Sequence, residues 1–543
     1  MPPSFPGESR GPDRSRKLDP GFRRGTARLS SFIVAAALAL AGCASAPPVA
    51  IDQRPSLGAA SAETRTLAAL ARIERLNPAL NAVIAVDPTA LDQAAALDLQ
   101  RKARGPLFGM PFLLKDNIEA KGPLPTTAGS LALKDNVTGR DAPLVANLRA
   151  AGAVIVGKAN LSEWANMRSS NSISGWSAIG GQTRNPHALD RNPCGSSSGS
   201  GAAVAAGMVP AAIGTETDGS ITCPAAVNGI VGFKPTVGLV SRTHIVPISH
   251  SQDTAGPMTR NVRDAALVLT AMAGTDSADP ATAEADARRT DYVAALSADA
   301  LRGRRIGVMR FADGFGTDAP FEEALATLRR AGAVLVDIAN FEGRGAIGEA
   351  EYQVLLTEFK ADLNAYLATL PPNVETRSLA DLIAFNKAHA ARELALFGQE
   401  IFIEAEATRG LDGPAYVKAR ADSLRMAGAE GIDRLLNQHD VVALVGPTMP
   451  PAWLIDAVNG DQISGGGAGG LAAVAGYPHL TVPMGAVKGL PVGLSFIGPK
   501  WSDGLILSLG YGYEQASQKR VEPQFLESIE EGPEIAPLLE PVE

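Results

Sequence analysis

Hydrophobic residues along this chain recur with two different periods, and segments of the two kinds alternate. In residues 62–76, Leu67, Leu70, Ile73 and Leu76 recur at helical spacing, which predicts an amphipathic helix. A second helix is predicted over residues 90–104. Short runs rich in β-branched residues predict strands at residues 81–86, 112–115, 154–157, 305–309, 333–336 and 441–445. This alternation predicts an α/β fold in which helices cover a largely buried sheet.

The first 42 residues differ from the rest and predict an export signal rather than a part of the fold. Arg23, Arg24 and Arg28 precede an apolar run at residues 32–41, which is shorter than the ~20 residues that a membrane-spanning helix needs. The run ends in Leu-Ala-Gly-Cys43, similar to a bacterial lipoprotein signal. We expect Cys43 to be the lipidated first residue of a membrane-anchored protein of the bacterial cell envelope or periplasm. An ordinary secretory signal with a chance cysteine is the alternative.

The composition predicts one globular domain between two flanking segments. Residues 43–60 are rich in alanine, proline and serine and predict a tether, and residues 521–543 predict an acidic flexible tail. The 543 residues carry a formal charge of −8, which gives no basic footprint for nucleic acid. No spacing of histidine, glutamate or cysteine is typical of a metal site, so we expect neither a metal nor a cofactor.

Two clusters dense in glycine and serine carry the candidate chemistry. The first contains Ser196, the second ends in Ser220, and an apolar, helix-like segment at residues 202–209 lies between them. A serine hydroxyl becomes a nucleophile when a nearby base takes its proton. Lys115 is the candidate base, because it follows an apolar run that would bury it, and burial lowers the pKa of a lysine.

This constellation resembles the amidase signature family, whose members cleave amide bonds with two serines and a lysine. The resemblance extends from about residue 76 to residue 515 and includes segments at residues 157–161, 181–186, 229–236, 253–258 and 483–498. It implies a single large domain over residues 61–520, with a mixed, twisted central β-sheet covered by helices on both sides. It also implies hydrolysis of a carboxamide C–N bond to a carboxylate and ammonia or an amine.

The resemblance implies a role for each residue of the constellation. Ser220 matches the nucleophile that forms an acyl-enzyme, Ser196 the bridging serine and Lys115 the base. The peptide bond between Gly195 and Ser196 is expected to be cis. The backbone amides expected to form the oxyanion hole are those of Thr217, Asp218, Gly219 and Ser220.

Two positions depart from the commonest family pattern. Asp218 stands where glycine is usual, and Thr222 stands where arginine is often found. The surrounding sequence resembles the branch of bacterial peptide amidases, which release ammonia from C-terminal peptide amides. We therefore expect a small-molecule or peptide amide as the substrate and no obligate protein partner. Asp218 could shape the substrate pocket or cap a turn.

Cys194 and Cys223 flank the two serine clusters with neither metal spacing nor a disulfide framework. We expect both to be small buried residues that line the site. A disulfide between them is the alternative if the protein faces an oxidising compartment.

Three other functions compete with this interpretation. Residues 195–199 also match the Gly-x-Ser-x-Gly elbow of α/β-hydrolase esterases, centred on Ser197, but no histidine has a matching context. Within the family, the A-type subunit of a tRNA-dependent amidotransferase would need partner proteins and a cytoplasmic location, which the export signal opposes. A non-enzymatic surface lipoprotein is disfavoured because Lys115, Ser196 and Ser220 are all present.

Overall fold

The computed structural model describes residues 60–100, 105–465 and 467–541. The predicted signal over residues 1–42, the lipidation site Cys43 and nearly all of the predicted tether lie outside these residues. The described residues form one compact unit. Within the described residues, no helix combines the length and the apolar composition that a membrane span requires.

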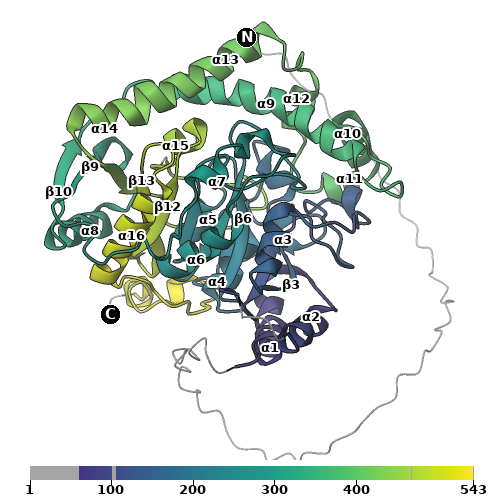
Figure 1. Ribbon diagram of the computed structural model, residues 1–543, viewed down its shortest axis with the longest axis horizontal. Helices are drawn as coiled ribbons and strands as arrows, with labels where there is room; N and C mark the ends of the chain where they lie inside the picture. Colours follow the sequence, from purple (N-terminus) through teal and green to yellow (C-terminus); the bar gives the residue numbers. More distant parts are fainter. Residues whose placement is uncertain (1–59, 101–104, 466, 542–543) are drawn as a thin grey trace, which may run out of the picture. The chain divides into compact units, whose positions relative to one another are not determined.

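The centre of this unit is a mixed sheet of eleven strands, which confirms the predicted fold class (Figure 1). Strand β2 pairs in parallel with β3 and β6, strand β9 pairs in parallel with β10 and β11, and the remaining neighbours are antiparallel. In sheet order the strands are β1 (Val83–Val86), β3 (Val154–Ala159), β2 (Pro111–Lys115), β6 (Ala211–Glu216), β8 (Thr254–Thr259), β7 (Val231–Lys234), β12 (His479–Val487), β13 (Leu490–Ile497), β11 (Ala443–Pro447), β9 (Arg305–Met309) and β10 (Val334–Ile338). A separate pair consists of β4 (Trp176–Ser177) and β5 (Gly181–Gln182).

Helices cover both faces of the sheet. Side chains alternate between the two faces along each strand, so one strand can contribute to a buried cluster on each face. In β2, Phe112 and Leu114 belong to one buried cluster, whereas Leu113 belongs to another. The first cluster includes side chains of α3 (Pro143–Ala150), α6 (Val262–Met272), α8 (Asp318–Arg330) and α16 (Asp503–Ser517). The second includes side chains of α1 (Ala62–Leu80), α2 (Ala90–Asp98), α4 (Ser198–Ala205) and α5 (Thr222–Val227).

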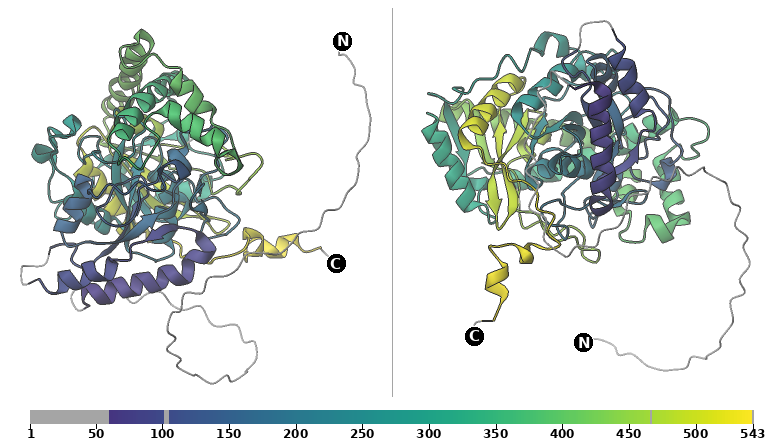
Figure 2. Two further views of the ribbon diagram at one scale, coloured as in Figure 1. Left: turned by 90° about the vertical axis from the view of Figure 1, so that its right-hand side faces the viewer. Right: turned by 90° about the horizontal axis from the view of Figure 1, so that it is seen from below.

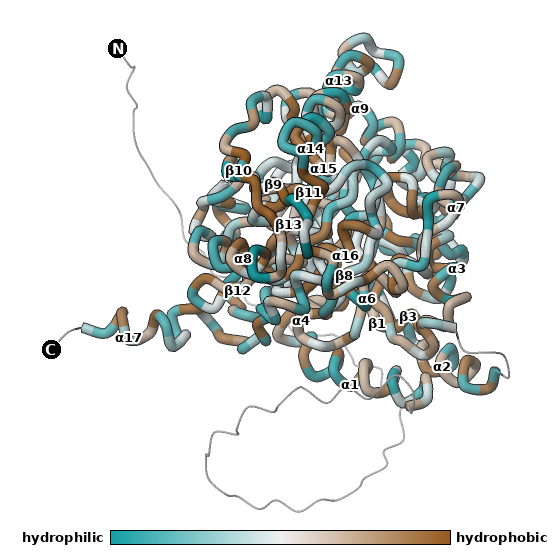
Figure 3. Tube along the Cα trace, turned by 60° about the vertical axis from the view of Figure 1, so that its left-hand side comes forward, coloured by the Kyte–Doolittle hydropathy of each residue, from teal (hydrophilic) through white to brown (hydrophobic). Residues whose placement is uncertain are grey.

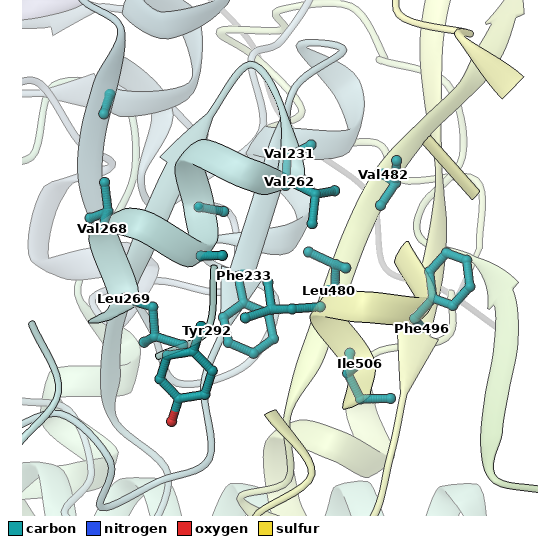
Figure 4. Close-up of a cluster of buried hydrophobic side chains, with 14 of the residues drawn as sticks. Val231, Phe233, Val262, Val268, Leu269, Tyr292, Leu480, Val482, Phe496 and Ile506 are labelled. Atoms are coloured by element: carbon teal, nitrogen blue, oxygen red, sulfur yellow. The ribbon is translucent and has the colours of Figure 1, made fainter. Parts of the chain in front are cut away.

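Figure 4 shows part of the first cluster, where Phe233 of β7 and Leu480 of β12 lie near Ile506 of α16. All three side chains are fully buried. Figure 3 shows hydrophobic colour along β9 and β10, whereas α14 (Arg434–His439) is largely hydrophilic. The core therefore lies between the sheet and its covering helices. Strand β2 is apolar except for its last residue, the ionisable Lys115.

A run of helices from residues 344 to 439 passes over one end of the sheet, at the top of Figure 1. A buried cluster joins its helices to the loops near the sheet through Trp164, Val246 and Ile248. The run consists of α9 (Arg344–Ala368), α10 (Leu379–Ala388), α11 (Ala390–Glu393), α12 (Glu400–Glu406), α13 (Pro414–Leu424), a π-helical segment (Arg425–Asp433) and α14.

The remaining helices are short, and one of them, α15, shares a buried cluster with side chains of β9, β11 and β13. Figure 2 shows α17 standing away from the rest of the domain, in the segment predicted to be an acidic flexible tail. The helices are α7 (Ala285–Arg288), α15 (Gly470–Ala475) and α17 (Ala536–Leu539), with 3₁₀ turns at Leu131–Leu133, Glu163–Asn166, Pro280–Thr282, Arg310–Ala312 and Ile529–Glu531.

Every strand that the β-branched runs predict is present as β1, β2, β3, β9, β10 or β11. The runs do not reveal β6 and β8, which lie in the middle of the sheet. The sequences of these strands are Ala-Ala-Ile-Gly-Thr-Glu and Thr-Ala-Gly-Pro-Met-Thr. They are rich in small residues and one contains proline, so they lack the runs of β-branched residues that predict a strand. Helix α4 begins at Ser198, earlier than the apolar segment indicates, and it therefore includes part of the serine cluster.

Candidate active site

Lys115 is the last residue of β2 and is completely buried. Alternation along the strand points it to the same face as Leu113, on which α4 lies. Its Nζ donates hydrogen bonds to Ser196 Oγ at 2.7 Å, to Thr215 Oγ1 at 2.8 Å and to the Thr215 carbonyl oxygen at 3.2 Å. All three acceptors are neutral.

The surroundings of Lys115 favour its uncharged form. Burial lowers its pKa to about 7, against the opposing effect of the negative charges of Asp253 and Glu216. A substantial fraction of the side chain is therefore a free amine at neutral pH. A free amine hydrogen-bonded to a serine hydroxyl can accept that hydroxyl's proton.

Ser196 lies in the turn before α4, and its peptide bond with Gly195 is cis, as the resemblance implied. The Ser162 N–H donates to the Ser196 carbonyl oxygen at 3.1 Å and fixes this turn against the chain after β3. A Cβ atom at Gly195 would lie 2.1 Å from Ser162 Oγ, so only glycine fits there. The close packing holds the Ser196 hydroxyl against Lys115.

Ser220 lies in the turn between β6 and α5 and is almost completely buried. The Ser197 N–H donates to the Ser220 carbonyl oxygen at 3.1 Å, which places the two serine clusters side by side. Among the described residues, no acceptor is hydrogen-bonded to the backbone N–H groups of Asp218, Gly219 or Ser220. A Cβ at Gly219 would meet nothing within 4 Å. The turn therefore leaves donors and open space beside the Ser220 hydroxyl.

Glu216, which sequence reasoning missed, holds the Ser220 turn in shape. Its carboxylate accepts hydrogen bonds from the N–H of Ile221 at 2.7 Å and of Thr222 at 2.9 Å, and from Thr222 Oγ1 at 3.2 Å. These bonds satisfy donors at the start of α5. Thr222, which departs from the family pattern, is thus bonded to Glu216 and buried.

Asp253, also missed, anchors Thr217 in the same turn. Its carboxylate accepts a hydrogen bond from Thr217 Oγ1 at 2.6 Å and from the N–H groups of Ile248 and Ser249 at 2.8 and 2.9 Å. Burial raises the pKa of Asp253 to about 6, although these bonds oppose the shift. The only signal for Asp253 in the sequence was that it lies in the segment at residues 253–258, which resembles the amidase signature family.

A small hollow that opens to solvent lies beside Ser196 and Thr217. Its polar lining includes Asn117, Arg242 and Asp253. Its apolar lining consists of Ala165, Ile245, Val246, Pro247 and Ile248. Such a mixture of polar and apolar side chains is typical of a pocket that binds an organic substrate.

Cys194 and Cys223 are buried, as expected, and they form the disulfide that the sequence left as an alternative. The two residues are 29 positions apart in sequence, yet their Cα atoms are 6.0 Å apart. The pairing of Ser197 with Ser220 brings the two turns together, and sequence spacing does not reveal that contact. The disulfide therefore joins the segment of Ser196 to the helix that follows Ser220.

Ser197, the candidate elbow nucleophile, is engaged elsewhere. Its hydroxyl donates to the Thr215 carbonyl oxygen at 3.1 Å and accepts from the Thr215 N–H at 3.2 Å. The side chain is completely buried. Ser197 therefore braces β6 and does not present a free hydroxyl.

One group of metal-ligand side chains occurs in the described part of the chain, namely His250, Glu358 and Asp362. His250 Nδ1 is already hydrogen-bonded to Asp362 at 2.9 Å. The Glu358 carboxylate accepts hydrogen bonds from the hydroxyls of Ser251 and Tyr416. These bonds tie α9 to the loop before Asp253, which gives the group a structural role.

Comparisons with known proteins agree with this geometry. The family model described as Amidase matches residues 65–507. A probable amidase of Arabidopsis thaliana is 40% identical over 470 residues, covering 84% of this chain and 87% of its own length. The A-type subunit of the glutamyl-tRNA(Gln) amidotransferase of Pseudomonas aeruginosa is 37% identical over 480 residues, covering 84% and 94%.

Solved structures show the same similarity. The native peptide amidase from Stenotrophomonas maltophilia superposes with a TM-score of 0.81 at 53% identity, covering 86% of this chain and 96% of that protein. The resemblance and the fold that the sequence predicted are therefore confirmed. The chain belongs to the amidase signature family and is an amide-hydrolysing enzyme.

Proposed function

We propose that this enzyme hydrolyses the C-terminal amides of peptides, with Ser220 as the nucleophile, Ser196 as the proton relay and Lys115 as the base. The observation that carries the assignment is the 2.7 Å hydrogen bond between Lys115 Nζ and Ser196 Oγ. Lys115 has only neutral hydrogen-bond acceptors, and burial lowers its pKa to about 7. It can therefore act as a base near neutral pH.

The proposed reaction begins with proton transfer along the three side chains. As Ser220 Oγ attacks the amide carbon, its proton passes to Ser196, and the Ser196 proton passes to Lys115. The N–H groups of the Ser220 turn donate to the developing oxyanion, and each such donor contributes about 3 kcal/mol in well-studied cases. The proton then returns through Ser196 to the leaving nitrogen, and ammonia departs. Water attacks the Ser220 ester by the same relay and releases the carboxylate.

Two observations support a peptide amide as the substrate. The solved structure at 53% identity is that of a peptide amidase. The hollow beside Ser196 has an apolar lining that suits the side chains of a peptide. Ammonia released from a panel of peptide amides and simple carboxamides tests this proposal. The expected result is turnover of peptide amides that Ser220→Ala abolishes, whereas equal turnover in Ser220→Ala would overturn it.

Similarity to an amidotransferase subunit raises a second candidate, glutamine amide hydrolysis with partner proteins. The peptide amidase is more similar to this chain, at 53% against 37% identity. Glutamine and a peptide amide offered to the purified chain alone distinguish the two functions. Turnover of glutamine, but not of peptide amides, would favour the amidotransferase function.

We also propose that the enzyme is exported and lipidated at Cys43. The basic and apolar N-terminal stretch supports export. The Cys194–Cys223 disulfide adds support, because disulfides persist mainly in oxidising compartments. Fractionation of cells that express the full chain tests the anchor. The protein should be in the membrane fraction and should move to the soluble fraction in Cys43→Ser.

A further inference from the structure

The carboxylate of Asp218 does not cap the turn in which it lies. Glu216 accepts the backbone hydrogen bonds at the start of α5, which a capping residue would otherwise accept. No described residue donates a hydrogen bond to the Asp218 carboxylate, and solvent reaches its side chain. Of the two roles that the sequence allows for Asp218, only the one in the substrate cleft is consistent with these contacts.

A second carboxylate, that of Glu351 on α9, is close enough to Asp218 for the two charges to act on each other. Gln252 Nε2 donates to Glu351 Oε1 at 2.7 Å and to the Thr217 carbonyl oxygen at 3.4 Å. This amide therefore connects α9 to the Ser220 turn. Asp218 Oδ2 lies 3.9 Å from the position that a Cβ atom of Gly470 would take, so α15 presents no side chain to the carboxylate.

The two carboxyl groups act on each other electrostatically. Partial desolvation by the surrounding protein raises the pKa of Asp218, the charge of Glu216 raises it further, and the charge of Lys234 opposes the shift. Loss of water contact and the charge of Asp218 likewise raise the pKa of Glu351, whereas the Gln252 hydrogen bond opposes it. Acidic groups thus outnumber the one lysine around this part of the cleft. A cation placed between the carboxylates would relieve their repulsion.

Unengaged donors in the same turn point to a ligand independently of the acidic pair. The N–H groups of Asp218, Gly219 and Ser220 have no acceptor among the described residues. Asp218 thus carries both an unpaired N–H, aimed at the reacting oxygen in the proposed mechanism, and an unpaired carboxylate. A substrate held at Ser220 must therefore pass close to Asp218.

We propose that Asp218 and Glu351 form a subsite for a cationic group of the substrate, an ammonium or a guanidinium carried next to the amide that is cut. The enzyme then prefers basic amides to neutral ones of the same size. This inference rests on the proposed function, because it places the reacting carbonyl at Ser220. The cation can be the free α-amino group of a short amide or a lysine or arginine side chain.

The test compares matched amides that differ by one charge. N-acetyl-lysine amide against N-acetyl-norleucine amide tests a side-chain cation, and leucine amide against N-acetyl-leucine amide tests an α-ammonium. We expect the wild type to prefer the charged member of at least one pair by roughly 10- to 100-fold in kcat/KM, as for hydrogen bonds to charged groups. Asp218→Asn and Glu351→Gln should each reduce this ratio at least severalfold.

The ratio of two substrates separates specificity from damage to the catalytic turn. A loss of activity that affects both members equally cancels in the ratio. Glu349→Gln is the matched control, since Glu349 is an exposed glutamate on the same helix. It should leave the ratio unchanged. A wild-type ratio near one for both pairs, or a ratio that neither Asp218→Asn nor Glu351→Gln lowers, would overturn the subsite.

A covalent probe gives a second readout that needs no amide substrate. Two alkyl fluorophosphonates of equal length, one ending in an ammonium and one in a methyl group, should label Ser220. The ammonium probe should label faster, and Asp218→Asn should remove the difference. Equal labelling by both probes would contradict the subsite but leave the Ser220 mechanism intact. Absence of labelling by either probe would instead contradict the proposed function, and the subsite with it.

Discussion

Two buried lysines lie on neighbouring strands and differ in one respect, the charge of their partners. Lys115 ends β2, and Lys158 of β3 pairs with Leu114, the residue before it. Both are essentially inaccessible to solvent. Lys158 Nζ contacts Asp116 Oδ1 at 3.1 Å, whereas the acceptors around Lys115 are hydroxyls and a carbonyl.

The difference separates a structural lysine from a candidate base. Burial lowers the pKa of both, but at Lys158 the adjacent Asp116 charge opposes the shift. Asp116 follows Lys115 directly in sequence, yet its carboxylate is bonded to Lys158 and Thr127 instead. Because successive side chains point to opposite faces, the Asp116 carboxylate lies beside Lys158 and not beside Lys115. Lys115 consequently remains available to accept a proton.

The largest effect is expected from Lys115→Met, which removes the base and keeps the side chain's bulk. We expect kcat/KM to fall by roughly 10²- to 10⁴-fold, the usual contribution of a general base. The free energy of unfolding should not fall. Because the folded pKa of Lys115 is lowered to about 7, the wild-type lysine destabilises the fold fully below that pH, and this effect disappears towards its unfolded pKa.

Steady-state kinetics and urea unfolding at pH 6 and pH 9 check both parts of this prediction. The variant should gain stability relative to the wild type at pH 6 more than at pH 9. Activity within tenfold of the wild type would contradict the role of Lys115.

Lys158→Met should act on stability instead. It leaves Asp116 buried without its cation, and breaking a buried pair in this way costs about 3–5 kcal/mol. Urea unfolding measures the loss. The double variant Lys158→Met/Asp116→Asn should recover part of it, because no buried charge remains. A single variant as stable as the wild type, with activity as low as that of Lys115→Met, would reverse the assignment of the two lysines.

Thr215→Asp would make the surroundings of Lys115 resemble those of Lys158. A carboxylate beside a lysine raises its pKa, by roughly 1–3 units at contact distance. Activity at pH 7 should therefore fall about tenfold or more and recover as the pH rises to 9. Thr215→Asn, of the same size but uncharged, should keep the wild-type pH dependence. The prediction fails if the two variants have the same pH profile.

The smallest effect is expected from Asp253→Asn. The charge of Asp253 raises the pKa of Lys115, so its loss should move the acidic limb of the pH–rate profile to lower pH, by less than about one unit at this indirect distance. Thr217→Val removes a hydrogen bond to Asp253 but keeps the charge of Asp253, so the acidic limb of its pH–rate profile should not move. A shift towards higher pH in Asp253→Asn would contradict the electrostatic argument.

The sequence predicts the candidate catalytic residues better than the residues that hold them in place. Lys115, Ser196 and Ser220 stand in motifs made of neighbouring residues in the sequence, and the structure brings their segments together. Thr215 and Glu216 belong to β6, whose place between β2 and β8 depends on strand register and not on local sequence. The Cys194–Cys223 disulfide was only an alternative at the level of the sequence for the same reason, since only the packed turns make the two cysteines neighbours.

The pH dependence of Ser220 phosphonylation tests whether Lys115 is a neutral base near pH 7. The second-order rate constant for a neutral alkyl fluorophosphonate reports nucleophile activation without product release. We expect this constant to rise with pH, with an apparent pKa of about 7. The rise should move to higher pH in Thr215→Asp and should be absent in Lys115→Met. A rise that persists unchanged in Lys115→Met would show that Lys115 is not the base.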